Sequence, residues 1–415
     1  MHRFLSSVLI AIIATIALFA QQRGDVNRDG KVNVTDVTTL VNMILGVQQT
    51  DSAAADVNQD THINVSDVTA LVNLIQNPPA PEPQDSICFM HISDTHSTDI
   101  TLKPMIEMLD TGDCAFAVIT GDLMPTTAML NELKAATKPI FQIPGNHDSW
   151  DGLGQRGFHE QVQLATNQDY DIHYGADDAC YFYADVRQNN RTLRVIGIDQ
   201  YEIETVGPTH TNSAIVYSQK QIDWFIDVLE HSDEVDGIII LAHAGFGNHA
   251  IGARDMSYVN EFVSINAWTF LFGYLHDGIS NPQMIPEIVE AFSTGANLEN
   301  VRYSNGIEGD TITINTHFTG PHNSFIAHYA GHIHFDIVEP LPNFPQQTMA
   351  IIAYGGKGRG NDWNDLVKPA TGEQSYTINR NTINFTTRQL DITRLGSTEK
   401  IDGTFRRHIS FPIRP

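Results

Sequence analysis

Five short apolar runs, each followed closely by Asp, His or Asn, constrain the fold of this chain more than any other feature of its sequence. Helical patterns over Pro104–Leu109 and Asn131–Ala136 separate the first three runs. Strands that alternate with helices in this way pair in parallel, so the pattern predicts an α/β fold with a parallel sheet. The runs are Ile87–Ile92, Ala115–Thr120, Pro139–Pro144, Gly237–Leu241 and Ser324–Ala330.

The polar residues after the runs are expected to meet at one edge of the sheet, because ligands in open α/β sheets bind outside the carboxyl ends of the strands. One carboxylate can bridge two cations, and mixed imidazole and oxygen ligands suit Zn, Fe or Mn better than Ca²⁺. The pattern therefore predicts a two-metal site, which can clamp a phosphoryl group and make hydroxide from a bound water at neutral pH. The clusters are Asp94-Thr95-His96, Gly121-Asp122, Gly145-Asn146-His147-Asp148, His243 and His332-Ile333-His334.

In their order, these clusters resemble the five-part signature of the calcineurin-like metallophosphoesterase superfamily, from Ile87 to about His334. The resemblance implies phosphoester hydrolysis and an α/β/β/α sandwich of two stacked sheets flanked by helices. It implies that His147 is not a ligand but assists the leaving group, as a proton donor or a charge stabiliser. The ligands it implies are Asp94, His96, Asp122 and His334 for the first metal, and Asp122, Asn146, His243 and His332 for the second, with Asp122 as the bridge.

Three neighbouring residues refine this expectation. Asp148 is expected to orient His147 by accepting its other N–H, and a plain turn or salt-bridge role is nearly as well supported. Purple acid phosphatases carry Tyr three residues after the bridging Asp, where this chain has Pro125, so a tyrosinate-ligated Fe(III) centre is not expected. Tyr201 is interpreted as an ordinary wall or core residue.

Residues 1–20 have the pattern of a secretory signal peptide, with Arg3, an apolar run and a small residue at Ala20. The apolar run is shorter than the roughly 20 residues needed to cross a bilayer. The chain is therefore expected to be secreted, to the extracellular space or the periplasm, with no membrane span after cleavage. An uncleaved membrane anchor is the alternative.

Residues 21–77 contain an internal repeat, in which the loop from Asp25 to Asp36 recurs from Asp56 to Asp67. Oxygen-bearing side chains at positions 1, 3, 5, 9 and 12, with a backbone carbonyl at position 7, match a 12-residue Ca²⁺ loop. Gly30 suits the sharp turn at position 6, whereas Thr61 should make the second site weaker. The candidate ligands are Asp25, Asn27, Asp29, Lys31, Asn33 and Asp36, then Asp56, Asn58, Asp60, His62, Asn64 and Asp67.

Each loop leads into a predicted helix with an apolar stripe, and the two stripes can bury each other. The stripes are Val37, Leu40, Val41 and Ile44, then Val68, Leu71, Val72 and Ile75. The repeat resembles a type I dockerin, which implies two bound Ca²⁺ and docking to a cohesin-like protein. In that family positions 10 and 11 help to choose the partner; here Val34-Thr35 and Val65-Ser66 leave its identity open. An acidic turn repeated by chance is the alternative.

The rest of the chain is divided by composition. A Pro-rich linker is predicted over 78–86 and a catalytic domain over 87–415. Within it, 246–323 is a candidate insertion that caps the metal site and shapes the substrate pocket, unless its aromatic residues only pack a core. The turn at 357–361 could touch phosphate, although a solvated hairpin is favoured. Alternating residues over Thr377–Phe385 and Thr387–Ile392 predict antiparallel strands that complete a second sheet.

Charge and cysteine content limit the function further. The formal net charge of −25 argues against a broad basic face, and hence against extended nucleic acid as a partner. Three cysteines cannot form a disulfide framework. Cys88, Cys114 and Cys180 each lie in or beside an apolar stretch, so buried free thiols are expected, with one bridge as the alternative.

The predicted function is that of a secreted, metal-dependent phosphoester hydrolase that acts on a small substrate and is tethered by its dockerin-like module. The patterns do not separate monoesters from diesters, so a nucleotide or cyclic-nucleotide phosphodiesterase is an alternative within this class. A catalytically inactive assembly protein of the cohesin–dockerin type is the alternative from another class.

Overall fold

The chain divides into two units, Met1–Gln84 and Asp85–Pro415, which are described separately below. The predicted signal peptide and nearly all of the predicted linker lie outside the described residues. The computed structural model describes residues 24–27, 31–47, 52–58, 62–76, 85–150, 152–202, 216–244, 284–304, 311–332, 337–339, 350–352, 375–396 and 408–413.

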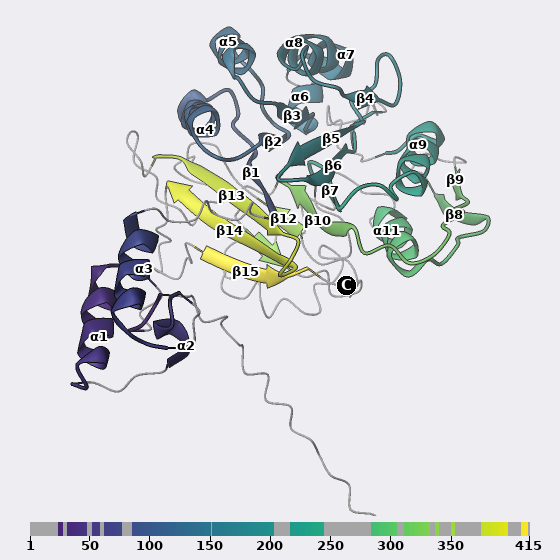
Figure 1. The fold of residues 1–415 in the computed structure, drawn as a ribbon. Coiled ribbons are helices and arrows are strands. Elements are labelled where there is room, and N and C mark those ends of the chain that lie inside the picture. The colour runs from purple at the N-terminus through teal and green to yellow at the C-terminus, as the bar shows by residue number, and fades with distance from the viewer. Residues whose placement is uncertain are drawn as a thin grey trace, which may run out of the picture. The chain divides into compact units, whose positions relative to one another are not determined.

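The first unit contains helices α1 (Val34–Ile44), α2 (Ser52–Ala55) and α3 (Val65–Gln76), drawn in purple and dark blue in Figure 1. Asn33 begins α1 by accepting the backbone N–H of Thr35 with its side chain, a typical N-cap. The centres of the predicted stripes are buried: Leu40 and Leu71 are fully buried, whereas Val41 is 36% exposed. The core of this unit comprises Val26, Leu40, Ala55, Val57 and Leu71.

The second unit is built on two sheets. The six-stranded sheet has the order β15-β14-β13-β1-β2-β3. Strands β1, β2 and β3 pair in parallel, which confirms the arrangement predicted from the first three apolar runs. Its strands are β1 (Ser86–Ile92), β2 (Phe116–Thr120), β3 (Ile140–Ile143), β13 (Thr377–Asn384), β14 (Gln389–Gly396) and β15 (His408–Pro412).

The strands of the carboxyl-terminal tail belong to this first sheet, and the prediction that they complete a second sheet was wrong. β13 pairs antiparallel with β1 from Ser86↔Asn384 to His91↔Asn379, and β14 follows it as a hairpin. The parallel pairing of β1 with β2 leaves the other edge of β1 open, and β13 occupies that edge. The alternation in the sequence indicates antiparallel strands but does not indicate which edge they join.

The second sheet has the order β11-β12-β10-β7-β6-β5-β4. At its centre β7 pairs in parallel with β6 and with β10, which brings the fourth and fifth apolar runs side by side. β10 also pairs in parallel with β12, whereas β11 pairs antiparallel with β12, and β5 pairs antiparallel with both β4 and β6. The strands are β4 (His173–Tyr174), β5 (Phe182–Gln188), β6 (Arg191–Gly197), β7 (Gly237–Leu241), β10 (Phe325–Ala330), β11 (Ile337–Glu339) and β12 (Ala350–Ile352).

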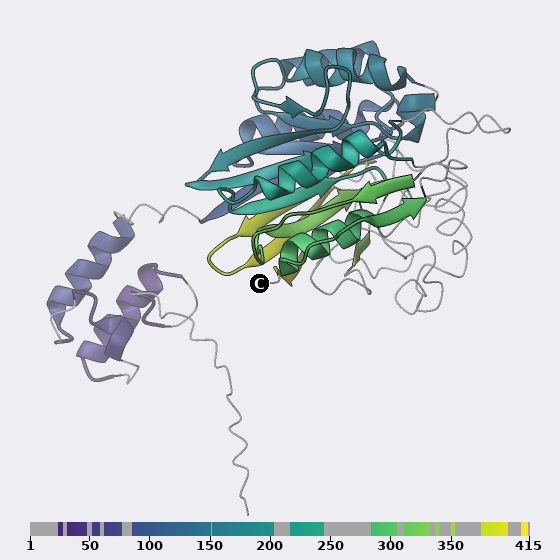
Figure 2. The ribbon, with the colours of Figure 1, turned by 90° about the vertical axis from the view of Figure 1, so that its right-hand side faces the viewer.

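Helices cover both outer faces, so the unit has the predicted α/β/β/α layers (Figure 2). One core joins the six-stranded sheet to α4 and α5, one lies between the sheets, and one joins the seven-stranded sheet to α9 and α11. The helices are α4 (Asp99–Thr111), α5 (Thr127–Ala135), α6 (Asn146–Trp150), α7 (Gly154–Phe158), the π-helix His159–Gln163, α8 (Leu164–Thr166), α9 (Gln219–Glu230) and α11 (Met284–Thr294).

The described part of the candidate cap belongs to the fold itself. Ile285, Ile288 and Phe292 of α11 are buried in the core against the seven-stranded sheet. Next to this helix, β8 (Val301–Ser304) and β9 (Thr311–Ile314) form a separate two-stranded sheet. Residues 246–283 and 305–310 of the candidate cap, and the turn at 357–361, lie outside the described residues.

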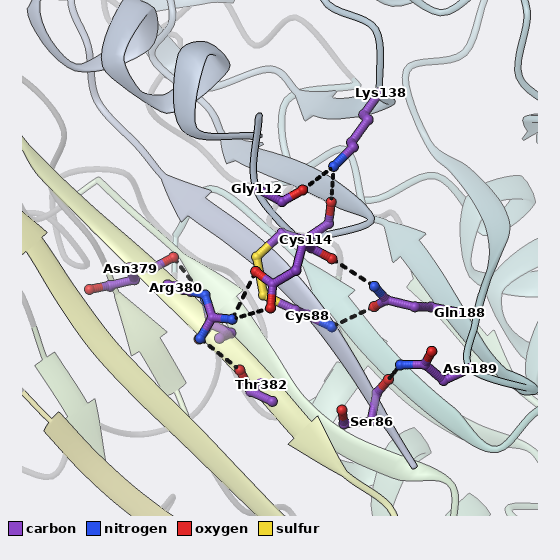
Figure 3. The surroundings of a disulfide bond; sticks show 12 residues. Ser86, Cys88, Gly112, Cys114, Lys138, Gln188, Asn189, Asn379, Arg380 and Thr382 are labelled. Carbon is purple, nitrogen blue, oxygen red and sulfur yellow. Dashed lines mark hydrogen bonds and ion pairs between the residues drawn. A yellow bond between two sulfur atoms is a disulfide. The ribbon is translucent and has the colours of Figure 1, made fainter. Parts of the chain in front are cut away.

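A disulfide joins Cys88 of β1 to Cys114, just before β2 (Figure 3). The two residues meet because the strands are neighbours: the backbone N–H of Ala115 donates to the Cys88 carbonyl at 2.8 Å. Lys138 closes the same turn, with its Nζ 2.9 Å from the Cys114 carbonyl. The expectation of free thiols was therefore wrong for Cys88 and Cys114, whereas Cys180 is a buried free thiol.

Among the residues that the structure describes, no helix has both the length and the apolar character required to cross a membrane.

Candidate active site

The loops that follow β1 and β2 are joined by their backbones. The Asp94 N–H donates to the Gly121 carbonyl, and the His96 N–H donates to the Asp122 carbonyl, each at 3.0 Å. The pairing of the two strands thus continues into the loops, and it brings Asp94, His96 and Asp122 together at the carboxyl edge of the sheet.

Left-handed backbone conformations gather at these positions. The φ angles are 53° at Asp94, 45° at His96, 50° at Asp122 and 70° at His332. Non-glycine residues rarely adopt such angles. The conformation costs roughly 1–2 kcal/mol per residue, and strain of this kind concentrates at functional sites. Four of the predicted ligands therefore occupy strained positions that the surrounding fold must hold in place.

Asp122 lies at the centre of the cluster and is almost completely buried. Its Oδ2 is 3.6 Å from Nε2 of His96 and 3.4 Å from Nε2 of His243. Its Oδ1 accepts the backbone N–H of His147 at 2.9 Å. One carboxylate thus faces imidazoles that come from β1 of one sheet and β7 of the other, as a bridging ligand would have to.

The ring of His243 is fixed by a backbone carbonyl. Its Nδ1 is 2.7 Å from the carbonyl oxygen of Thr120, which can only accept a proton, so Nδ1 carries the hydrogen. Its Nε2 then points at Oδ1 of Asn146, 3.0 Å away, and at Oδ2 of Asp122. Two oxygen acceptors around this nitrogen require a positive charge between them, either a proton on Nε2 or a bound cation. The donor set therefore fits a metal ion.

The pKa shifts of Asp122 and His243 agree with this geometry. Burial disfavours the charge on Asp122, but the imidazoles of His243, His147 and His96 outweigh it and lower the pKa of the carboxyl far below its usual value. Burial also lowers the pKa of His243, and the Asp122 carboxylate reverses that effect and raises it to about 10. The cluster thus favours a cationic partner for Asp122.

The fifth motif reaches the same place from β10. The backbone N–H of His332 donates to Oδ2 of Asp94 at 2.9 Å, and its Nδ1 is 3.1 Å from Oδ1 of Asn146. The strands that lead into these residues belong to two sheets. The site that was expected at the edge of a single sheet therefore lies where the carboxyl ends of strands from both sheets meet. His334, the remaining predicted ligand, lies outside the described residues.

His147 lies beside the predicted ligands, with its ring 5.0 Å from that of His96 in an edge-to-face arrangement. Ligand atoms of His96, Asp122 and His147 lie within 4.8 Å of one another, and those of Asp94, Asp122 and His243 form a second such group. The two groups share Asp122. His147 is thus close enough to act on a group held at the cluster.

Asp148 makes its contacts with backbone amides, and not with His147 as expected. Its Oδ2 accepts the N–H groups of Leu123 at 3.1 Å and Gly145 at 2.9 Å, and its Oδ1 accepts that of Met124 at 2.6 Å. Within the described residues, both oxygens are thus engaged by the loops after β2 and β3. Asp148 therefore ties the loop of Asp122 to that of Asn146. Burial, with the nearby Asp122, raises its pKa to about 6.

Two glycines allow the loops to approach this closely. Gly121 has φ +90°, and a Cβ there would overlap the ring of His243. A Cβ on Gly145 would overlap the carboxylate of Asp122. The glycines in the Gly-Asp and Gly-Asn-His-Asp motifs are therefore required by the packing of the candidate ligands.

The two predicted calcium loops have matching internal bonds. Asp36 accepts the backbone N–H groups of Asn27 at 3.0 Å and Asn33 at 2.9 Å. In the second loop, Asp67 accepts the equivalent groups at 3.1 and 2.8 Å. The carboxylate at position 12 therefore closes each loop before its helix begins. Asp29, Gly30, Asp60 and Thr61 lie outside the described residues.

Some residues of the site had no signal in the sequence. The carbonyl of Thr120 sets the tautomer of His243 and also accepts the hydroxyl of Ser93 at 2.9 Å. Gln200 binds both backbone groups of Ala244, the residue after His243. A backbone carbonyl has no residue-type signature, and a glutamine after a strand is ordinary, so only the three-dimensional arrangement identifies these residues.

Comparisons with known proteins agree with this description. The family model described as dockerin type I domain matches residues 23–76, and that described as calcineurin-like phosphoesterase matches residues 88–273. A comparison with curated proteins found no significant match.

Several solved structures are similar to parts of the chain. A putative 5'-nucleotidase from Staphylococcus aureus is 14% identical, covering 80% of this chain and 55% of its own, with a TM-score of 0.39. NAD nucleotidase from Haemophilus influenzae is 11% identical, covering 78% and 53%, with a TM-score of 0.35. An archaeal phosphodiesterase is 15% identical, covering 37% and 72%, with a TM-score of 0.22. The chain spans about half the length of the two nucleotidases.

The two family matches fall on the two units that the structure separates, and the second begins at the strand that leads into Asp94. The chain therefore combines a type I dockerin domain with a domain of the calcineurin-like phosphoesterase family, a family of phosphoester hydrolases.

Proposed function

We propose that this chain is a secreted phosphoester hydrolase with a dinuclear metal centre, tethered to a partner through its dockerin domain. The observation that carries the proposal is the position of Nε2 of His243, which faces oxygens of both Asp122 and Asn146. Such a donor set is complementary to a divalent cation. The family match at 88–273 supplies the reaction class.

The residues proposed to hold the metals come from all five motifs. In our proposal Asp122 is shared between two ions, which are Mn, Zn or Fe. When bound, the two cations would neutralise the phosphoryl oxygens and acidify the attacking water. The proposed ligands are Asp94, His96, Asp122 and His334 for one ion, and Asp122, Asn146, His243 and His332 for the other.

The protein's own groups prepare this site. The Thr120 carbonyl keeps the hydrogen of His243 on Nδ1, which leaves Nε2 directed at the site. The Asp148 carboxylate holds the loops of Asp122 and Asn146 at a fixed distance. His147 is proposed to give a proton to the leaving oxygen as it departs, which general acid catalysis favours. Small phosphoesters are the proposed substrates.

Hydrolysis by the full chain tests the proposal. The protein is freed of metal with a chelator, then assayed with p-nitrophenyl phosphate and bis(p-nitrophenyl) phosphate, alone and with Mn²⁺, Zn²⁺ or Fe²⁺. Activity that returns with metal supports the proposal, and the ratio of the two rates separates monoester from diester preference. A folded, metal-loaded chain that hydrolyses neither would favour an assembly protein without catalytic function. Nucleotides and cyclic nucleotides extend the same panel.

The dockerin domain supports the proposed tether and location. We infer that it binds two Ca²⁺ and docks to a cohesin-like protein outside the cytoplasm. The matching closures of the two loops by Asp36 and Asp67 support two ion sites. Val34 and Val65, at position 10 of the loops, are 70% and 68% exposed and so are accessible to a partner.

A further inference from the structure

The pairing between β6 and β7 stops just before His243. The last backbone bond runs from the Ile198 N–H to the Leu241 carbonyl, at 2.8 Å. His243 lies two residues beyond this point, so the ladder with β6 no longer holds its backbone. On its other side, the Gly331 N–H of the β10 loop donates to the His243 carbonyl at 2.8 Å. On the side that faces β6, the backbone around His243 must therefore be held by hydrogen bonds other than those of the strand pairing.

The side chain of Gln200 replaces the missing ladder. Its Oε1 accepts the Ala244 N–H at 2.6 Å, and its Nε2 donates to the Ala244 carbonyl at 3.0 Å. The same Nε2 lies 3.2 Å from the hydroxyl of Tyr217. Gln200, Ala244 and Tyr217 are each at most 2% exposed. Buried hydrogen bonds of this kind are strong determinants of position, because breaking them leaves polar groups without water.

A second bridge from the same turn reaches α6. Nε2 of Gln155 donates to Ser149 Oγ at 2.7 Å, to Asp199 Oδ1 at 3.3 Å and to the Tyr201 carbonyl at 2.8 Å. Ser149 follows Asn146 and His147 in the same short helix. The end of β6 is thus connected both to the residue after His243 and to the helix that carries Asn146.

We propose that Gln200 is a positioning residue for the second metal, which it acts on through His243. It fixes both backbone groups of Ala244 and so sets where Nε2 of His243 stands relative to Asp122 and Asn146, 3.4 and 3.0 Å away. This inference rests on the proposed dinuclear function. Outer groups that orient a ligand typically change metal affinity or activity by about 10–100-fold.

The test uses the full chain and Mn²⁺ as the probe. The number and affinity of bound Mn²⁺ are measured by equilibrium dialysis, and paramagnetic resonance shows whether two ions are coupled. Gln200→Met keeps the side-chain length and removes all three hydrogen bonds. We expect it to bind the first ion normally, to bind the second at least about 10-fold more weakly, and to lose the coupled signal.

Gln142→Met is the matched control. Gln142 is a buried glutamine of β3, as little exposed as Gln200, and its amide bonds go to Thr166 and Asn167. Its loss should lower stability while both ions and their coupling remain. Gln200→Glu serves if the Met variant does not fold, since it keeps the acceptor for the Ala244 N–H and loses the donor; it should weaken the second ion by a smaller factor.

The outcomes separate two kinds of failure. Wild-type protein that binds fewer than two Mn²⁺ would overturn the proposed dinuclear centre, and this inference with it. Wild-type protein that binds a coupled pair, beside a folded Gln200 variant that binds the same pair with unchanged affinity, would overturn the role of Gln200 alone. If the Gln142 variant loses the second ion to the same extent, the weaker binding in the Gln200 variant reflects a general loss of stability, and the role of Gln200 is overturned as well.

Discussion

Backbone atoms, as much as side chains, decide what each residue of the candidate site can do. The Thr120 carbonyl selects the tautomer of His243, and the His147 N–H holds one oxygen of Asp122. The strained φ angles at Asp94, His96 and Asp122 aim these side chains inward. Replacing a side chain in such a setting removes its chemistry while the backbone contacts remain, so point substitutions can separate the proposed roles.

Removal of the shared carboxylate is the first prediction. Asp122→Ala should lose both metals and lower kcat/KM by about 1,000-fold or more, since cation stabilisation of a phosphoryl group is worth several kcal/mol. Metal content by elemental analysis and hydrolysis of p-nitrophenyl phosphate check it. A variant that keeps both metals and its activity would contradict the proposed bridge.

His147→Ala should behave differently. A missing general acid costs roughly 10²–10⁴-fold in kcat, but the backbone N–H that His147 donates to Asp122 is kept by Ala. We therefore expect a low kcat with the wild-type number of bound metals. The deficit should shrink on substrates whose leaving group needs no proton, so rates are compared across phenols of different pKa. A uniform loss across them would argue against proton donation.

Asp199 provides a pH-dependent prediction. Burial, above all, raises the pKa of this carboxyl to about 8, although its bond from the Tyr201 N–H opposes the shift. A carboxyl with a higher pKa in the folded state binds more protons when folded, so the free energy of unfolding falls as the pH rises from about 4 to about 8.

Asp199→Asn keeps the acceptor oxygen and removes the titration. Its stability relative to the wild type should therefore increase by at most about 1.4 kcal/mol per pH unit across that window and level off above it. Urea unfolding at pH 5, 6.5 and 8 measures the difference, and the point at pH 5 is the internal reference. A difference that does not change with pH would contradict a raised pKa.

At the scale of elements, apolar runs predicted the strands well and their partners less well. β1, β2, β3, β7 and β10 lie where the runs lie, because strands that are buried on both faces are nearly continuous apolar runs. The tail strands were placed on the wrong sheet because alternation reports which faces are buried but not which edge is free. The motif residues at the strand ends were predictable, whereas Thr120 and Gln200 act through backbone contacts that sequence does not encode locally.

The link between the loops after β2 and β3 gives an element-scale prediction. Asp148→Asn keeps one acceptor oxygen and turns an amide N–H₂ toward the remaining backbone donor, so it should cost about 1–3 kcal/mol of stability. If Asp148 holds the loops, the same cost appears in the His147→Ala background, because the two effects are independent. Urea unfolding of the single and double variants measures this. A cost that disappears in that background would restore the role of orienting His147.

On the scale of the whole molecule, charge is shared unequally between the units. Residues 1–84 carry 8 acidic and 4 basic side chains, and residues 85–415 carry 41 and 20. A catalytic unit with a formal charge of −21 would repel phosphate at long range unless cations reverse the field at the site. The net charge therefore excludes a broad basic face but remains compatible with small phosphoesters.

The division into two units predicts that calcium acts on only one of them. Asp36 and Asp67 close the two loops of the dockerin unit, and the described residues of its core all lie within that unit. An ion that binds only the folded state stabilises it by about 4 kcal/mol per site at 1,000 times its Kd.

Calorimetry of the full chain should therefore show two unfolding transitions. Ca²⁺ should raise the transition temperature of the smaller unit only, while kcat of the Mn²⁺-loaded enzyme stays unchanged. Mg²⁺ at equal ionic strength is the control for screening. A single transition that moves as a whole with Ca²⁺ would show that the units are coupled, and an unmoved smaller transition would show that the loops do not hold calcium.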